Sequence, residues 1–153
     1  MTITVNGIEE VRGLVGQTVG PSGWREVTQE DIDKFADVSG DHQWIHVDVE
    51  RAKTESPFGT TIAHGNCTLS MIDGFRPELM ESTGFKMGVN YGWNKIRFPA
   101  PVPSGSRIRA SVETVSVDEV GGGWYQIVYK WTVEVEGSEK PACVAESVVR
   151  LLA

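Results

Sequence analysis

The stretch Trp124–Glu136 reads WYQIVYKWTVEVE, and its alternation of apolar and polar residues decides the fold class. Every second residue from Tyr125 onward is aromatic or β-branched, while the residues between them are mostly polar. Side chains alternate between the two faces of a strand, so this pattern predicts a strand with one buried face. Weaker versions of the same pattern predict further strands over 85–98, 106–118 and 142–152.

The links between these strands predict an antiparallel sheet. Gly121–Gly123 joins two of the strands as a hairpin, and Gly137–Lys140 turns the chain into the last strand. The apolar phase slips between Val112 and Val115, which predicts a β-bulge.

Helical spacing appears only before the strands. Cys67, Met71, Phe75 and Leu79 recur every four residues, which predicts a helix over about 66–82 with one apolar stripe. Thr28, with an acid three residues later, is typical of a helix start, and the chain continues to a stop signal at Gly40. A short helix is expected to begin at Asp48. Segregated helices and strands indicate one α+β domain over residues 1–153, with the sheet around the long helix.

The whole-chain charge argues against nucleic-acid binding. The 153 residues carry 14 Lys and Arg against 21 Asp and Glu, a net charge of -7, whereas a nucleic-acid binder needs a basic surface. The segment Ser82–Val112 departs from this average because it contains no acid. Its five bases are Lys86, Lys95, Arg97, Arg107 and Arg109. The segment is either a solvated sheet face or a local site for an anionic group.

The cysteines and the N-terminal residues predict the compartment. Cys67 and Cys143 lack metal or redox spacing, which favours buried thiols in a reducing environment. The first ten residues lack the basic start and apolar run of a secretory signal. No apolar run reaches the roughly 18 residues of a membrane span. We therefore expect a cytoplasmic protein.

All three histidines, His42, His46 and His64, lie in the irregular stretch from residue 41 to residue 65. Loops on a rigid scaffold often carry binding and catalytic groups. Asp41 and His46 are five residues apart, a spacing that does not place two side chains on the same face of a helix, whereas spacings of three and four do. They can converge in a turned loop, and Gly40 supplies the backbone freedom for such a turn.

Four interpretations of this loop compete. Asp41 can cap a turn while His46 bonds to the backbone, with no chemical role for either. His42 and His46 have a zinc-ligand spacing, but Gln43 replaces the Glu of H-E-x-x-H and the local sequence does not look helical, so no metal is expected. Cys67 is a poor nucleophile because the apolar stripe predicts its burial. In the fourth interpretation, a carboxylate and a neutral imidazole hold one water, and the residues alone support this as well as the first.

Three short motifs resemble those of one enzyme family. Phe35–His46, FADVSGDHQWIH, resembles the hydratase-2 motif of MaoC-like (R)-specific enoyl-CoA hydratases. Ile62–Gly65, IAHG, is similar to the family's second signature, a His-Gly pair that opens the central helix. Arg97–Val102, RFPAPV, is similar to the third, which begins the sheet. The motifs occur in order, and the resemblance extends over about 15–152.

The sequence departs from the family pattern inside the first motif. His42–Trp44 stands where an Asn-Pro pair is usual, so the loop lacks the rigidity that proline supplies. We expect Trp44 to pack in the core in its place; lining the pocket is the alternative.

The resemblance implies the hotdog fold, an antiparallel sheet wrapped around a long central helix. It also implies a homodimer whose sheets join edge to edge, with a tunnel for an acyl thioester at the interface. In this family pattern, Asp41 and His46 hold the water that adds to C3 of the substrate. The backbone N–H of Gly65 polarises the thioester carbonyl, and Asn66 can add a hydrogen bond. The resemblance implies no metal or redox cofactor.

The function implied is an (R)-specific enoyl-CoA hydratase, a hydro-lyase that converts trans-2-enoyl-CoA reversibly to (3R)-hydroxyacyl-CoA. One alternative is a hotdog acyl-CoA thioesterase, for which the central helix offers Asp73, Glu78 and Glu81 as carboxylates. The other is a non-catalytic acyl-thioester-binding subunit, although the presence of both Asp41 and His46 argues against it.

A CoA ester also gives the acid-free segment a use. Its phosphates need only a few nearby cations, and Lys95 and Arg97 lie beside the third motif. We therefore expect these two residues to contact the nucleotide end of CoA.

Overall fold

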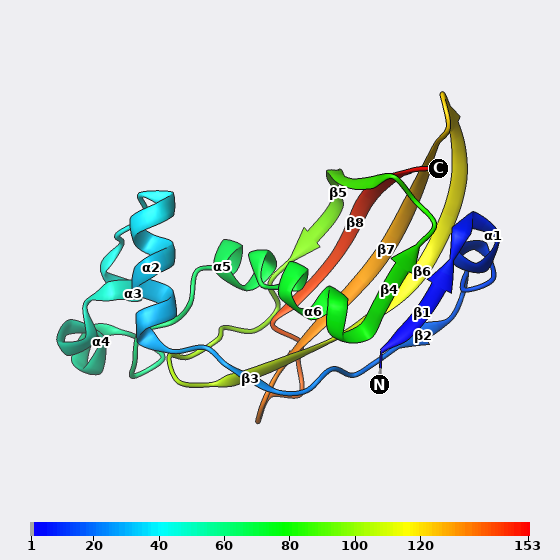
Figure 1. Ribbon diagram of the computed structural model, residues 1–153. Helices are drawn as coiled ribbons and strands as arrows, with labels where there is room; N and C mark the ends of the chain where they lie inside the picture. Colours follow the sequence, from blue (N-terminus) through cyan, green and yellow to red (C-terminus); the bar gives the residue numbers. More distant parts are fainter. Residues whose placement is uncertain (1) are drawn as a thin grey trace.

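A computed structural model describes residues 2–153 and shows a curved antiparallel sheet with helices along its concave face and a further group of helices beyond one end (Figure 1). The strands are β1 (Ile3–Asn6), β2 (Thr18–Val19), β3 (Arg25–Glu26), β4 (Met80–Thr83), β5 (Met87–Arg97), β6 (Arg107–Gly121), β7 (Trp124–Val135) and β8 (Cys143–Leu152). The helices are α1 (Gly7–Arg12), α2 (Gln29–Ser39), α3 (Trp44–Val47), α4 (Val49–Glu55), α5 (Gly65–Ser70) and α6 (Ile72–Leu79). The α+β prediction is confirmed.

The main sheet has the strand order β2-β6-β7-β8-β5, and β3 also pairs with β6. The strands predicted over 85–98, 106–118, 124–136 and 142–152 correspond to β5, β6, β7 and β8. Gly121 pairs with Trp124 across the predicted hairpin, and a register shift between Thr114 and Ser116 confirms the bulge. The strand β5 returns to pair with β8, so it forms the outer edge of the sheet.

The core lies between the two central helices, α5 and α6, and the concave face of the sheet (Figure 1). The apolar stripe is buried as predicted, with Phe75 and Leu79 only 2% exposed. It shares one core cluster with the inward residues of β7, among which Trp131 is fully buried. The Trp131 indole N–H donates to Ser147 Oγ at 3.2 Å, so its polar atom is satisfied. Burial stabilises the fold by about 1.5–3 kcal/mol for each large apolar side chain.

The prediction of one helix over 66–82 is wrong at two places. The helix divides into α5 and α6 at Met71, where the Met71 N–H is shared between the carbonyl oxygens of Cys67 and Thr68, both at 3.2 Å. The sharing tightens the turn without breaking the apolar stripe. Helical structure then ends at Leu79, because Met80 is extended and begins β4.

The strand β4 pairs in parallel with β1, with Ile3 opposite Met80. The sequence did not predict this two-stranded sheet, because its strands are short and their partners lie far apart in the chain. The short strands β2 and β3 were missed for the same reason.

The predicted helix start at Thr28 is confirmed in detail. The Thr28 hydroxyl accepts from the Asp31 N–H, and the Asp31 carboxylate accepts from the Thr28 N–H, both at 3.1 Å. The helix α2 ends at Gly40, whose φ of 79° is in the left-handed region that favours glycine. The chain therefore leaves α2 at a sharp angle just before Asp41.

Both thiols are buried, as predicted. Burial raises the pKa of the Cys143 thiol to about 11 and also raises the pKa of Cys67. Among residues 2–153, none of the helices combines the length and apolar character that crossing a membrane requires.

Candidate active site

His46 lies on α3, and one nitrogen of its ring is fixed by a backbone carbonyl. The ring is 7% exposed, and Nδ1 lies 2.7 Å from the carbonyl oxygen of Ile62. A carbonyl only accepts, so Nδ1 carries the proton and donates it. The neutral tautomer then leaves the Nε2 lone pair available as a base or as an acceptor from water.

The single turn of α3 is held in place by a half-buried network of hydrogen bonds. The Gln29 amide donates to the His46 carbonyl oxygen at 2.8 Å, and Thr61 donates to the Gln29 side-chain oxygen. The Ile62 N–H donates to the Ile45 carbonyl oxygen at 3.0 Å. Sequence reasoning missed Gln29 and Thr61, because they act on the main chain of a distant segment and have no local signature.

Asp41 directly follows Gly40, the residue in the left-handed conformation that ends α2, and its carboxylate closes a small turn. Its Oδ1 accepts from the Gln43 N–H at 3.2 Å, and its side chain is exposed. Its backbone carbonyl oxygen accepts from Nε2 of His64 at 2.9 Å. The turn therefore holds the carboxylate of Asp41, and His64 holds its backbone.

His64 is a member of the site that the residues alone did not single out, although it belongs to the second motif. It is 3% exposed, and its ring stacks on His46 with centroids 3.8 Å apart and planes inclined by 24°. The Phe35 ring covers it at 4.9 Å. Within residues 2–153 its Nδ1 has no hydrogen-bond partner, which leaves a buried acceptor next to the dyad. The clustering of all three histidines in one loop was the available signal.

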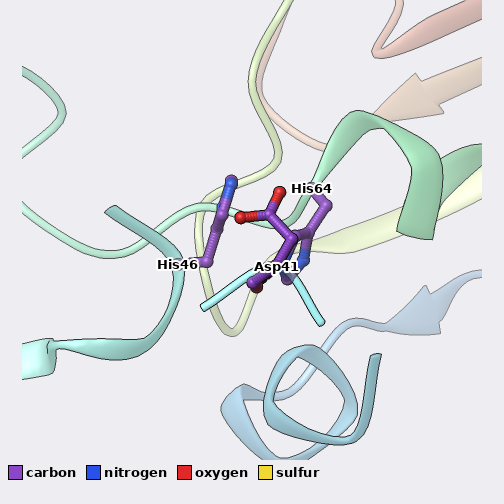
Figure 2. Close-up of side chains that lie close together, drawn as sticks. All are labelled: Asp41, His46 and His64. Carbon is purple, nitrogen blue, oxygen red and sulfur yellow. Dashed lines mark hydrogen bonds between the residues drawn. The ribbon is translucent and has the colours of Figure 1, made fainter. Parts of the chain in front are cut away.

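Asp41, His46 and His64 come together at one point, where a carboxylate oxygen and one ring nitrogen of each histidine lie within 4.8 Å of one another (Figure 2). The nitrogen lone pairs of the two stacked rings lie in nearly parallel planes whose ring centroids are 3.8 Å apart, so one metal ion at about 2.0–2.1 Å from both nitrogens cannot lie in both planes and fits poorly. Hydrogen bonds to a water are longer and tolerate more angular spread. The arrangement therefore favours a water held by a carboxylate and a neutral imidazole.

His42 does not join His46: it is exposed, and its Nε2 lies 3.8 Å from Asp37 on α2.

Two expectations for this loop are wrong, the core position of Trp44 and the lack of helical structure. Trp44 is only half-buried and is absent from the core cluster of the described residues, so the expectation of a core tryptophan is wrong. The Arg51 guanidinium lies 4.1 Å above its ring instead. The prediction that this segment is not helical is also wrong, because Trp44–Val47 forms one helical turn.

Gly65 opens α5 beside a mostly apolar hollow of about 280 Å³. The hollow is lined by Phe58, Ile62, Ala63, Gly65, Thr68, Phe98, Pro99, Ala100, Pro101, Val102 and Ala142. The second and third motifs therefore meet at its walls. The N–H of Gly65 belongs to the first helical turn, where no intrahelical carbonyl can accept it. Asn66 is exposed and does not line the hollow, whereas Thr68, which sequence reasoning missed, does.

Glycine is required at position 65 by a neighbouring ring rather than by its own dihedral angles. A Cβ at this position would lie 2.8 Å from the Phe98 ring carbons. The ring therefore packs directly on the backbone at the start of α5. Phe98 is 44% exposed, so the ring has room to turn outward.

The acid-free segment is less available to anions than its sequence predicts. Arg107 forms a two-point ion pair with Glu136, and Arg109 pairs with Glu134 at 2.8 Å. The Lys95 and Arg97 side chains are exposed, and Arg97 directly precedes Phe98 at the wall of the hollow. Among the described residues, neither of these two takes part in an ion pair.

We expect Gly65→Ala to destabilise the fold by about 1–3 kcal/mol, because the added methyl group displaces the Phe98 ring. In a Phe98→Ala background the same change should cost much less. Urea unfolding of the four proteins in this double-mutant cycle measures the coupling. An equal cost in both backgrounds would contradict the assigned contact.

The sequence was compared with known families and proteins. Residues 10–135 match the family model of the MaoC like domain. Over 150 residues the chain is 51% identical to the 3-hydroxyacyl-thioester dehydratase Z of Mycobacterium tuberculosis, and the match covers 98% of this chain and 99% of that protein.

Solved structures agree with the sequence matches. A monoamine oxidase regulatory protein from Archaeoglobus superposes with a TM-score of 0.78 at 28% identity, over 96% of this chain and 95% of that one. An R-hydratase from Pseudomonas aeruginosa superposes with a TM-score of 0.69 at 22% identity, over 90% of this chain and 81% of that one. The wrapped sheet is therefore the hotdog fold predicted from the motifs, and the chain belongs to the MaoC-like dehydratase family of hydro-lyases.

Proposed function

We propose that the chain is an (R)-specific enoyl-CoA hydratase that interconverts trans-2-enoyl-CoA and (3R)-hydroxyacyl-CoA. The observation that carries this proposal is the convergence of the Asp41 carboxylate with the fixed His46 ring. The similar protein of Mycobacterium tuberculosis is named as a dehydratase of 3-hydroxyacyl thioesters, the class of compound proposed here.

In the hydration direction, Asp41 and Nε2 of His46 hold a water above C3 of the enoyl group. Asp41 takes a proton as the water oxygen bonds to C3, and the electrons of the double bond pass through C2 toward the thioester oxygen. The proton then returns to C2, with His46 orienting the water and helping the transfer. One water is added, and the enzyme ends as it began.

The Gly65 N–H is proposed to donate to the thioester carbonyl and to stabilise the enolate that forms. Its place at the wall of the apolar hollow supports this role. The apolar side chains around the hollow lower the local dielectric, and a hydrogen bond to developing charge is stronger there than in water. Asn66, which is exposed, is left with no observation in favour of a substrate contact.

A homodimer is also proposed. The strand β5 is the outer strand of the sheet, with Met87 50% exposed and Tyr91 61% exposed. An edge of this length with exposed large side chains is suited to pairing with a second copy.

The thioesterase alternative gains no support from the central helix. Asp73 and Glu78 of α6 are exposed, and Asp73 lies 4.0 Å from Arg76 of its own helix. The prediction that Glu81 belongs to the helix is wrong, because the helix ends at Leu79 and Glu81 is an exposed residue of β4. A nucleophile or base for thioester cleavage would need to face the substrate.

The direct test is incubation with crotonyl-CoA and longer trans-2-enoyl-CoA esters. We expect loss of the conjugated enoyl absorbance without release of free thiol. The reverse reaction should accept the (3R)-hydroxyacyl ester and not its (3S) form. Release of free thiol would indicate a thioesterase, and no change with any chain length would leave only a binding role.

Asp41→Asn and His46→Gln should each lower kcat by roughly 10²–10⁴, because each removes one of the groups that hold and deprotonate the water. Asp37→Asn and His42→Gln are matched controls, since these exposed residues form the neighbouring Asp–His pair. Circular dichroism checks that the fold is kept. Near-wild-type rates for both dyad variants would refute the assignment.

Charge reversal at Lys95 or Arg97 should raise KM for the CoA ester by about tenfold, the loss of one hydrogen bond to a charged group. A pantetheine ester, which lacks the nucleotide, should be much less affected. Lys86→Glu is the control, because Lys86 belongs to the same acid-free segment but precedes β5 at its far end. Equal effects on the two esters would count against a CoA contact.

A further inference from the structure

Arg76 on α6 is a half-buried cation that the proposed reaction does not use. Its Nη2 atom is buried and has no hydrogen-bond partner within residues 2–153. Nearest among the acids is Asp73, whose carboxylate oxygen lies 4.0 Å away, beyond hydrogen-bond distance. The guanidinium lies 5.4 Å from the Tyr129 ring and 5.1 Å from the Trp131 ring of β7. A buried donor of this kind is costly unless something accepts from it.

Arg76 lines a cavity of about 440 Å³. The cavity lies near the C-terminal end of α6, whereas the Asp41–His46 site lies near the start of α5. The cavity lies within the range of about 300–1,000 Å³ typical of small-molecule sites. Its apolar walls come from Met80, Phe85, Met87, Val89, Val149 and Leu151. Its polar side chains are Arg76, Ser82, Asn90 and Tyr129.

The charge in the cavity is unbalanced. No acidic side chain is among the residues that line it. Glu81 lines a neighbouring hollow of about 550 Å³ that Arg76 also lines, but Glu81 is exposed to solvent, which screens its charge. Burial raises the pKa of the Tyr129 phenol, so at neutral pH its hydroxyl is protonated and able to donate. The cavity thus combines apolar walls with donors and one positive charge.

Because the Arg76 side chain is 26% exposed and lines this largely apolar cavity, with its nearest carboxylate beyond hydrogen-bond distance, we propose a binding site for a carboxylate carried on an apolar chain. The carboxylate accepts from Arg76 and the chain lies against the apolar walls. A carboxylate matches the planar donors of guanidinium better than a hydroxyl or a neutral carbonyl does. The ligand is either a free fatty carboxylate or the carboxylated distal end of a long acyl thioester. Gly65 and Arg76 lie on successive helices, roughly 16 Å apart at about 1.5 Å per residue, so only a long chain would reach both.

Isothermal titration of the full chain with octanoate tests the site, with octan-1-ol as the uncharged control. Arg76→Leu should weaken octanoate binding by about tenfold or more. The octanoate affinity of Arg76→Lys should lie between those of the wild type and Arg76→Leu. Octan-1-ol binding should not depend on residue 76. Arg12→Leu is the matched control, because Arg12 is a helical arginine that also faces an acid three residues earlier, Glu9, at 3.7 Å. Near-ultraviolet circular dichroism verifies the fold of each variant.

Octanoate affinity that is unchanged in Arg76→Leu, or no greater than that for octan-1-ol, would overturn the proposal. A dimer that dissociates in Arg76→Leu, together with no octanoate binding to the wild type, would assign Arg76 to a second copy of the chain instead. These titrations do not depend on catalysis, so they stand even if the hydratase proposal fails. A competition experiment between octanoate and a trans-2-enoyl-CoA that ends in a carboxylate then distinguishes the two ligand sources. If the distal carboxylate of the thioester occupies the cavity, it excludes octanoate; if the ligand is a free fatty carboxylate, octanoate binding is unchanged.

Discussion

The packing of one apolar helical stripe against the inward face of the sheet is the contact on which the other parts of the structure depend. Phe75 and Leu79 of α6 share one core cluster with Trp131 of β7, whose indole N–H donates to Ser147. Because this contact fixes the central helices on the concave face, it also fixes where α5 begins. The catalytic candidates lie just before that point, and the Arg76 cavity lies at the opposite end.

The candidate site is built mostly by main-chain hydrogen bonds rather than by contacts among its reactive groups. The carbonyl oxygens of Ile62 and Asp41 select the tautomer of His46 and the orientation of His64. Gln29 in turn fixes the backbone of His46 from α2. Such contacts hold an imidazole rigidly while leaving one ring nitrogen unbonded. The usual Asn-Pro pair is absent here, and a half-buried Trp44 under Arg51 occupies that part of the loop.

Charge acts locally in this molecule. The net charge of -7 describes the whole chain, but Arg107 pairs with Glu136 and Arg109 pairs with Glu134, so two of the five cations of the acid-free segment are neutralised. Lys95 and Arg97 stay exposed, and Arg76 is half-buried with its nearest carboxylate, Asp73, 4.0 Å away. An acidic protein can therefore present cations at two separate places where an anionic ligand can reach them.

The sequence by itself determined the four long strands, the bulge, the capped α2 and the apolar stripe, because each has a periodic or capping signal within a few residues. It also placed Asp41 and His46 in one loop and, through three motifs, predicted the family. Only the tertiary structure decided the β1–β4 pair, the division of the central helix and the exposure of Asn66. It alone stacked His64 on His46 and placed Phe98 over Gly65. Most of these features depend on contacts between residues far apart in the chain, which leave no pattern in either segment alone. The division of the helix arises instead from the shared hydrogen bond of Met71, which does not alter the apolar spacing.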